Sequence, residues 1–174
     1  AGLVRYDGNS FTHYNSFENS ENLFITDIIE DKKQNLILTT RYKGMFVFDG
    51  KKIIKKIPYQ KYNDQFDIVQ KMVKVGDRIY GVSQNRIYVV NDDLTITPVL
   101  SIFNKKIKKI NSISSVGTES FIVATDDGLY QYLEGEFLQL DFAGDEICLS
   151  DNNLNFYYVG DKKGNIYIIQ FNKA

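Results

Sequence analysis

The sequence predicts an all-β protein made of repeated four-stranded sheets. Its composition, its turn residues and an internal repeat all lead to that prediction. The 174 residues include 12 Phe and 12 Tyr, no Trp and only two Pro, and aromatic side chains favour pleated, half-buried strands. Asn, Asp and Gly fall between the apolar runs, where tight turns need them. No stretch combines helical apolar spacing with capping residues at both ends.

One apolar motif recurs five times, starting at positions 2, 44, 86, 128 and 165. The first three intervals are each 42 residues long and the last is 37, a regularity that unrelated strands would not readily produce. The five copies are Gly2–Gly8, Gly44–Gly50, Arg86–Asp92, Gly128–Glu134 and Asn165–Gln170. The motif therefore marks a repeating structural unit of about 40 residues.

Each later copy of the motif follows two further apolar segments, separated from each other by a polar turn. The segments directly before the motif are Asn35–Thr40, Arg78–Ser83, Ser120–Thr125 and Asn155–Gly160. The segments before these begin near Ile25, Val69, Ile110 and Ile147. A fourth strand follows the motif, for example at Lys52–Ile57 and Leu94–Val99. Four short antiparallel strands in about 40 residues are typical of a β-propeller blade.

Within each blade we name the strands A to D, from the propeller axis outward. Strand D is expected at the outer rim, where the lysines of Lys51–Ile57 would block unwanted edge pairing. The chain reads C-D, then A-B-C-D three times, then A-B-C. About four blades are thus expected, as an arc of a larger ring of the seven-bladed type with more blades before Ala1 or after Ala174. The alternative is a free-standing four-bladed ring with one strand displaced. The whole chain, 1–174, is one propeller fragment, with repeats at about 2–43, 44–85, 86–127 and 128–164 and a partial unit at 165–174.

The units resemble the two-component regulator propeller repeat. That repeat has an apolar strand, an Asp and a turn, a G-N-L-W-I-G-T block and then G-L-x-x-Y-D. Ile25–Glu30, Asp31, Asn35–Thr40 and Gly44–Gly50 follow this order, and the resemblance covers essentially the whole chain. Two departures are the absent Trp, whose place is taken by Ile37, Tyr80, Ile122 and Tyr157, and the missing first Gly in the copy at Arg86.

The resemblance implies a periplasmic sensor region that precedes a transmembrane helix and a histidine kinase, often in hybrid two-component proteins of Bacteroidetes. It implies a carbohydrate-type ligand. No cofactor and no catalysis by this chain are expected. The expected partners are a small-molecule or oligosaccharide ligand, neighbouring blades or domains of the parent chain, and a second copy in a homodimer. Nucleic acid and direct membrane insertion are not expected, because the net charge is −1 and the apolar runs are short.

The candidate ligand-binding residues are Arg41, Tyr42, Asp126 and Asp127, which lie in predicted B-to-C loops. Such loops line one face of a propeller, and an arginine beside a tyrosine offers a planar hydrogen-bonding fork and an apolar ring to a sugar. The simpler interpretation, which we prefer, makes all four ordinary turn residues.

No catalytic residue or metal ligand is predicted. His13 is the only histidine and is expected on an exposed rim strand; Cys148 is the only cysteine and is expected as buried filler in an A strand. Asp151–Asn155 is better explained by a hairpin than by a calcium loop. The runs Asn104–Ile110 and Lys51–Lys56 are read as solvated faces rather than phosphate sites.

Two other functional classes stay open at this point. A propeller lyase or glycosidase would need convergent acids or a histidine-based site on one face, and the scarcity of histidine counts against it. The other class is a scaffold that binds protein partners and no small molecule. Binding of an oligosaccharide would distinguish a sensor from a scaffold.

Overall fold

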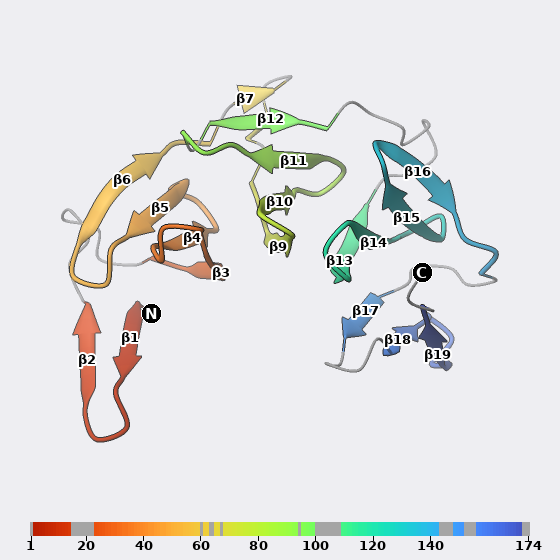
Figure 1. The fold of residues 1–174 in the computed structure, drawn as a ribbon, viewed down its shortest axis with the longest axis horizontal. Coiled ribbons are helices and arrows are strands. Elements are labelled where there is room, and N and C mark those ends of the chain that lie inside the picture. Colours follow the sequence, from red (N-terminus) through yellow and green to blue (C-terminus); the bar gives the residue numbers. More distant parts are fainter. Residues whose placement is uncertain are drawn as a thin grey trace. The chain divides into compact units, whose positions relative to one another are not determined.

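The computed structural model describes residues 2–14, 23–59, 61–62, 65–66, 68–93, 95–99, 109–142, 148–151 and 156–171. All regular secondary structure in these ranges is β-strand (Figure 1). The chain forms two compact units, Ala1–Gln70 and Lys71–Ala174, and each is described by itself.

The first unit contains a hairpin and a four-stranded sheet. Strands β1 (Leu3–Tyr6) and β2 (Phe11–Tyr14) form the hairpin. The sheet has the order β3-β4-β5-β6, all antiparallel, with bounds Ile25–Glu30, Leu36–Thr40, Met45–Phe48 and Ile53–Ile57. The short strands β7 (Lys61–Tyr62) and β8 (Gln65–Phe66) pair with each other.

The second unit contains three antiparallel sheets. Strands β9 to β12 form the first, at Lys71–Val75, Arg78–Val82, Ile87–Val90 and Ile96–Pro98. Strands β13 to β16 form the second, at Ile110–Val116, Ser120–Thr125, Leu129–Leu133 and Glu136–Gln139. Strands β17 (Cys148–Asp151), β18 (Phe156–Gly160) and β19 (Ile166–Gln170) form the third.

This strand order confirms the predicted series C-D, A-B-C-D three times, then A-B-C, and with it the all-β class. Every strand in a sheet pairs with its neighbour in sequence, as in a propeller blade. The β7–β8 hairpin is an addition that the repeat did not predict. Each sequence repeat starts at strand C, so it supplies strands C and D of one sheet and strands A and B of the next.

Alternation along the strands gives two apolar faces to each sheet whose side chains the structure describes. We call the face toward the following sheet in the chain the leading face, and the face toward the preceding sheet the trailing face. Leading residues Tyr80, Val82 and Ile87 cluster with trailing residues Phe121 and Val123 of the next sheet. The A strand β13 contacts the A strands β9 and β17 of both neighbouring sheets. Within this unit, A strands therefore lie next to each other, as predicted for strands nearest a propeller axis.

The pairing corrects one sequence expectation. Ile37, Tyr80 and Ile122 each pair with the fourth residue of the recurring motif, namely Val47, Val89 and Gln131. In the last sheet the residue that pairs with the fourth position, Ile168, is Tyr158. Tyr158 therefore takes the place of the family's Trp, and Tyr157 lies on the opposite face, where it clusters with Ile122 and Leu129.

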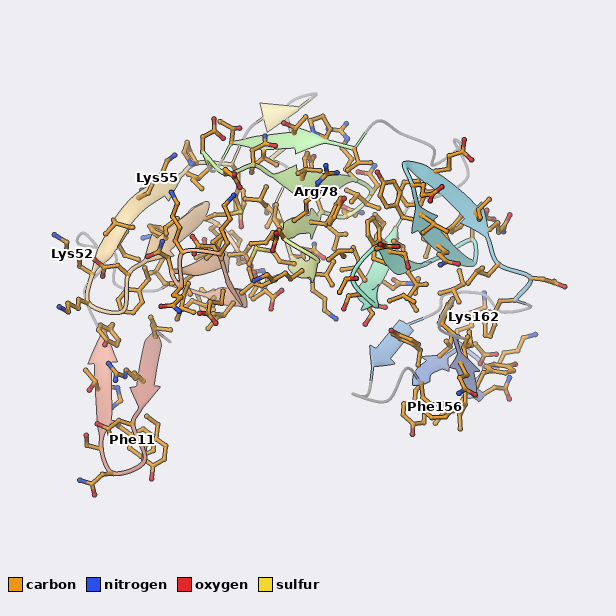
Figure 2. All side chains as sticks on the ribbon, viewed as in Figure 1. Phe11, Lys52, Lys55, Arg78, Phe156 and Lys162 are labelled. Carbon is orange, nitrogen blue, oxygen red and sulfur yellow. The ribbon has the colours of Figure 1, made fainter. Side chains whose placement is uncertain are left out.

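The outer strand β6 carries exposed lysines, as predicted for a rim strand. Lys55 and Lys56 are exposed in the burial pattern of β6, and Figure 2 shows Lys52 and Lys55 on this side of the sheet. Charged side chains on a rim strand hinder pairing with another strand.

Two turns with nearly the same sequence have the same geometry. In Asp31–Asn35 the Oδ1 atom of Asp31 accepts hydrogen bonds from the Lys33 and Asn35 amides at 2.7 and 2.8 Å. In Asp161–Asn165 the Oδ1 atom of Asp161 accepts from the Lys163 and Asn165 amides, both at 2.9 Å. The fourth turn residue has positive φ in both cases, 64° at Gln34 and 84° at Gly164.

Replacing Gln34 with Gly is therefore expected to stabilise the protein. A side chain in the left-handed region costs about 1–2 kcal/mol, and the greater freedom of glycine in the unfolded chain offsets about 0.4–1 kcal/mol of that gain. Urea unfolding should show a net increase of about 0.5 kcal/mol in the free energy of unfolding. The reciprocal change, Gly164→Gln, should lower it, and a loss of stability in Gln34→Gly would contradict the explanation.

Candidate functional site

The B-to-C loops and the starts of the A strands lie at the same end of each sheet. The Arg41 amide donates a hydrogen bond to the carbonyl oxygen of Phe24 at 2.9 Å. In the second unit the Asp126 amide donates to the carbonyl oxygen of Lys109 at 3.1 Å. This end of the sheets is the one that the sequence predicts for ligand binding.

Three side chains at this end of the first unit form what we call the aromatic loop cluster: Phe24, Arg41 and Tyr42. The two aromatic rings are open to solvent, since Tyr42 is 67% exposed and Phe24 is 51% exposed. The ring centroids of Phe24 and Tyr42 are 6.3 Å apart in an edge-to-face arrangement. The guanidinium carbon of Arg41 lies 5.4 Å from the Tyr42 ring centroid. An exposed aromatic ring and a planar cation are thus side by side.

The loop that carries Arg41 and Tyr42 is closed by a buried threonine. The Thr40 hydroxyl donates to the carbonyl oxygen of Gly44 at 2.7 Å and accepts from the Lys43 amide at 3.0 Å. Thr125 does the same in the second unit, donating to the carbonyl oxygen of Gly128 at 2.8 Å and accepting from the Asp127 amide at 3.1 Å. The terminal threonine of the block is therefore a structural support of the loop.

The carboxylates of Asp126 and Asp127 accept hydrogen bonds from neighbouring residues of the same sheet. Asp126 Oδ1 accepts from the Lys109 amide at 3.1 Å, and Asp127 Oδ2 accepts from the Tyr130 hydroxyl at 3.0 Å. Burial, and then the hydrogen bond and charge of Asp127, raise the pKa of Tyr130 to about 12. These contacts suit the turn interpretation.

The structure brings Arg41 and Tyr42 together, and it places Asp126 next to Asp127. The first pair belongs to the unit Ala1–Gln70 and the second to the unit Lys71–Ala174. Each pair is therefore a feature of its own unit, and a joint role of the two pairs in ligand binding stays a prediction.

Sequence reasoning missed Phe24 and Tyr59. Phe24 directly precedes strand β3 and looks like a core residue in the sequence, because only the pairing of β3 with β4 brings it to the Arg41 loop. Tyr59 is buried at 8% exposure. Its hydroxyl donates to the carbonyl oxygen of Thr40 and accepts from the Thr40 amide at 3.2 Å, and the carbonyl oxygen of Val69 lies 3.3 Å away. Tyr59 therefore ties the base of the loop to the segment before β9.

The Tyr59→Phe variant is expected to lower the free energy of unfolding by about 1–3 kcal/mol, because buried backbone groups lose a partner. Burial raises the pKa of Tyr59 to about 12. The folded state therefore favours the neutral phenol, so its contribution is fully present below about pH 10 and is lost as the pH rises toward 12. Unfolding measured from about pH 9 to 12 should show a decline on the order of 2 kcal/mol.

The control for this measurement is the Tyr6→Phe variant, because Tyr6 is 59% exposed. It should keep the alkaline decline of the parent chain, whereas Tyr59→Phe should make the decline smaller and leave the part that comes from Tyr130, whose pKa is also raised to about 12. An identical alkaline decline in the parent chain and in Tyr59→Phe would show that Tyr59 does not titrate in this window.

The other predicted residues have the following positions. His13 lies on strand β2 and is exposed, as expected for a rim strand. Cys148 begins strand β17, as expected for an A strand, but its side chain is not described. Most of the predicted hairpin at Asp151–Asn155 and of the run Asn104–Ile110, namely residues 152–155 and 104–108, lies outside the described residues. In the described ranges no group of three His, Cys, Asp or Glu could hold a metal ion. No helix among the described residues is long and apolar enough to cross a membrane.

Comparison with known proteins finds matches among solved structures. No family model and no curated protein matches the chain. The extracellular domain of BT4673, a candidate one-component system of B. thetaiotaomicron, matches with a TM-score of 0.73 and 16% identity over 99% of this chain and 25% of that one. The extracellular domain of BT3049, a candidate hybrid two-component system of the same organism, matches at 0.69 and 17% over 96% and 26%. Virginiamycin B lyase from Staphylococcus aureus matches at 0.64 and 13% over 94% and 60%.

These matches establish the class of fold. The pattern of consecutive antiparallel sheets is that of a partial β-propeller, and the predicted fold class is confirmed. The chain spans about a quarter of the length of the two extracellular domains that it matches.

Proposed function

We propose that this chain is an extracytoplasmic, ligand-sensing propeller region of a two-component regulatory system. The observation that carries the proposal is the match of nearly the whole chain to extracellular domains of candidate one-component and hybrid two-component systems. The recurring motif, as in Gly44–Gly50, independently resembles the repeat of that family. In this proposal the chain is periplasmic and non-catalytic, and a histidine kinase elsewhere in the parent protein produces the output.

The ligand in this proposal is a carbohydrate that contacts the aromatic loop cluster. The Tyr42 ring offers a flat apolar surface to the face of a sugar, and Arg41 offers several N–H donors to its hydroxyl groups. A ligand shifts a conformational equilibrium only through its difference in affinity for the two states. Signalling therefore requires that the ligand bind one arrangement of this region and its neighbours more tightly than the other.

Calorimetry with a panel of oligosaccharides tests the proposal. A binding oligosaccharide should lose at least tenfold in affinity to the Tyr42→Ala variant, and Arg41→Ala should have a similar effect. Arg78→Ala is the matched control, because Arg78 (labelled in Figure 2) is an exposed arginine. It lies at the other end of its sheet, next to the A-to-B turn. Binding that survives both cluster variants unchanged would move the site elsewhere.

Two other functions predict different results in the same assays. If the chain were a propeller enzyme, a polysaccharide would be converted to product. A variant of the matching lyase in which one histidine is replaced is described as catalytically inactive. The single histidine of this chain, His13, is exposed on β2. A scaffold predicts no heat with any sugar, together with capture of a protein partner.

A further inference from the structure

The loop of the aromatic loop cluster carries two positive charges within three residues. Arg41 and Lys43 flank Tyr42, and all three residues are exposed. The guanidinium carbon of Arg41 lies 5.4 Å from the centroid of the Tyr42 ring. Among the described residues, neither Arg41 nor Lys43 forms an ion pair with a carboxylate. Both charges can therefore interact with a molecule that approaches this loop from solvent.

The conformation of this loop does not depend on the two charges. The Thr40 hydroxyl closes the loop through the carbonyl oxygen of Gly44 and the amide of Lys43. The Tyr59 hydroxyl holds the base of the loop through the backbone of Thr40. All of these contacts use backbone atoms of the loop, so the guanidinium of Arg41 and the ammonium of Lys43 are not needed to shape it.

The corresponding loop of the second unit uses its charges differently. Thr125 closes that loop with the same two hydroxyl contacts. The charged residues there are Asp126 and Asp127, which are acidic. Their carboxylates accept hydrogen bonds from the Lys109 amide and the Tyr130 hydroxyl. The charged groups of the second loop thus have hydrogen-bond partners inside the protein, whereas the two cations of the first loop have no carboxylate partner among the described residues.

The acidic residues of sheet β3–β6 do not balance the charge at this end. Asp27 pairs with Thr39 near the B-to-C loop, is only partly exposed, and accepts a hydrogen bond from the Ile28 amide at 3.0 Å. The other acidic residues of this sheet lie next to the A-to-B and C-to-D turns at the opposite end, namely Glu30, Asp31 and Asp49. The described side chains at the B-to-C end therefore sum to a positive charge, which attracts an anionic molecule.

We propose that the ligand of the aromatic loop cluster is an anionic carbohydrate, one that carries carboxylate or sulfate groups. This inference rests on the proposed sensing function and narrows its ligand class. The guanidinium of Arg41 can donate two parallel N–H bonds to one such group, and these charge-assisted bonds are roughly twice as strong as neutral ones. Lys43 is two residues away, so its Cα atom lies within about 7 Å of that of Arg41 and its ammonium adds a second positive charge. The Tyr42 ring between them packs on the face of the sugar.

Matched pairs of sugars test the role of charge directly. Calorimetry with the 174-residue chain compares a short oligogalacturonate with its methyl ester, and a sulfated galactan oligosaccharide with its desulfated form. In at least one pair the anionic member should bind about tenfold more tightly, because hydrogen bonds to a charged group are the stronger ones. The pair that shows the preference identifies the anionic group as carboxylate or sulfate. The affinity of the anionic member should fall between about 0.1 M and about 1 M salt, since the Debye length shrinks from about 10 Å to about 3 Å.

Variants of the loop show whether the preference arises there. Arg41→Gln and Lys43→Gln remove a charge but keep a polar side chain, so each should weaken binding of the anionic member about tenfold and change that of the neutral member less. Tyr42→Ala should weaken both members, because both present the face of a sugar to the ring. Lys33→Gln is the matched control, since Lys33 is an exposed lysine in the A-to-B turn at the other end of the same sheet.

The outcomes separate this inference from the proposed function. A neutral sugar that binds as tightly as its anionic partner, and loses affinity in Tyr42→Ala, would overturn the anionic ligand and leave the sensing function standing. A preference for the anionic member that both loop variants retain, or that Lys33→Gln also loses, would overturn the site. Absence of heat with every sugar would contradict the proposed function and this inference together.

Discussion

Replacing Gly44 with Ala is expected to lower the free energy of unfolding by about 3 kcal/mol. Gly44 has φ of 95°, where a side chain costs about 1–2 kcal/mol. A Cβ atom there would also lie 2.2 Å from the carbonyl oxygen of Ile57 and 3.0 Å from the Cα atom of Pro58. These are backbone atoms, so the start of β5 or the end of β6 must move. Such overpacking typically costs a further amount of about 1–3 kcal/mol.

Gly50→Ala separates the two causes. Gly50 has φ of 89°, but a Cβ atom there would have no neighbour within 4 Å. It should cost only the backbone term of about 1–2 kcal/mol, less the amount of about 0.4–1 kcal/mol that alanine recovers by restricting the unfolded chain, which leaves a net loss on the order of 1 kcal/mol. Urea unfolding of both variants measures the difference between their free energies of unfolding. The slopes of free energy against urea concentration should be compared as well. Equal losses would show that the approach of Gly44 to Ile57 is unimportant.

A positive φ explains the glycine that opens the recurring motif in two of its three glycine copies, Gly44 and Gly128, but not Gly2. Gly128 has φ of 130°, and a Cβ atom there would lie 3.3 Å from Gln139 Nε2, the end of a flexible side chain. Arg86, at the start of another copy, is not among the residues with positive φ. The departure of this copy from the family pattern is therefore a local change of loop conformation, and β11 still forms at the expected place.

The sequence predicted the strands well because alternation and spacing are local signals. The B strands Leu36–Thr40 and Arg78–Val82 coincide with the predicted blocks. The exchange of Tyr157 and Tyr158 was not predictable from spacing, because it depends on cross-strand pairing. The loop between β18 and β19 holds the five residues Asp161–Asn165. The loop between the paired residues Thr39 and Met45 also holds five residues, and that between Ala124 and Leu129 holds four, so loop length alone does not set which residue faces the fourth position of the motif.

The candidate site was predictable only in part. Arg41 and Tyr42 were found because polar and aromatic residues in a B-to-C loop stand out between apolar strands. Phe24 could not be found in this way, since it reaches Tyr42 through a backbone contact between segments 17 residues apart in sequence. Tyr59 gives no sequence signal either, because its role depends on the burial of its hydroxyl group against Thr40.

Phe121→Ala is expected to lower the free energy of unfolding by about 4 kcal/mol, a larger loss than that of Gly44→Ala. Phe121 is 0% exposed. Its ring centroid lies 4.8 Å from that of Tyr80 across the sheet interface, and 4.7 and 6.0 Å from those of Tyr132 and Phe137 in its own sheet. Removing this ring leaves a cavity where two sheets meet, and the fixed strands around it cannot close the gap.

Phe24→Ala is the matched truncation, because the Phe24 ring is 51% exposed and makes its ring contact with Tyr42 in the open. It should cost less than about 1 kcal/mol, since little apolar surface is uncovered. A double-mutant cycle between Phe121→Ala and Tyr80→Ala then tests where the loss arises. If sheet-to-sheet packing is responsible, the two losses should be non-additive by about 1 kcal/mol. Additive losses would place the effect of Phe121 within its own sheet, and the interface between sheets β9–β12 and β13–β16 would then depend on its aliphatic residues instead.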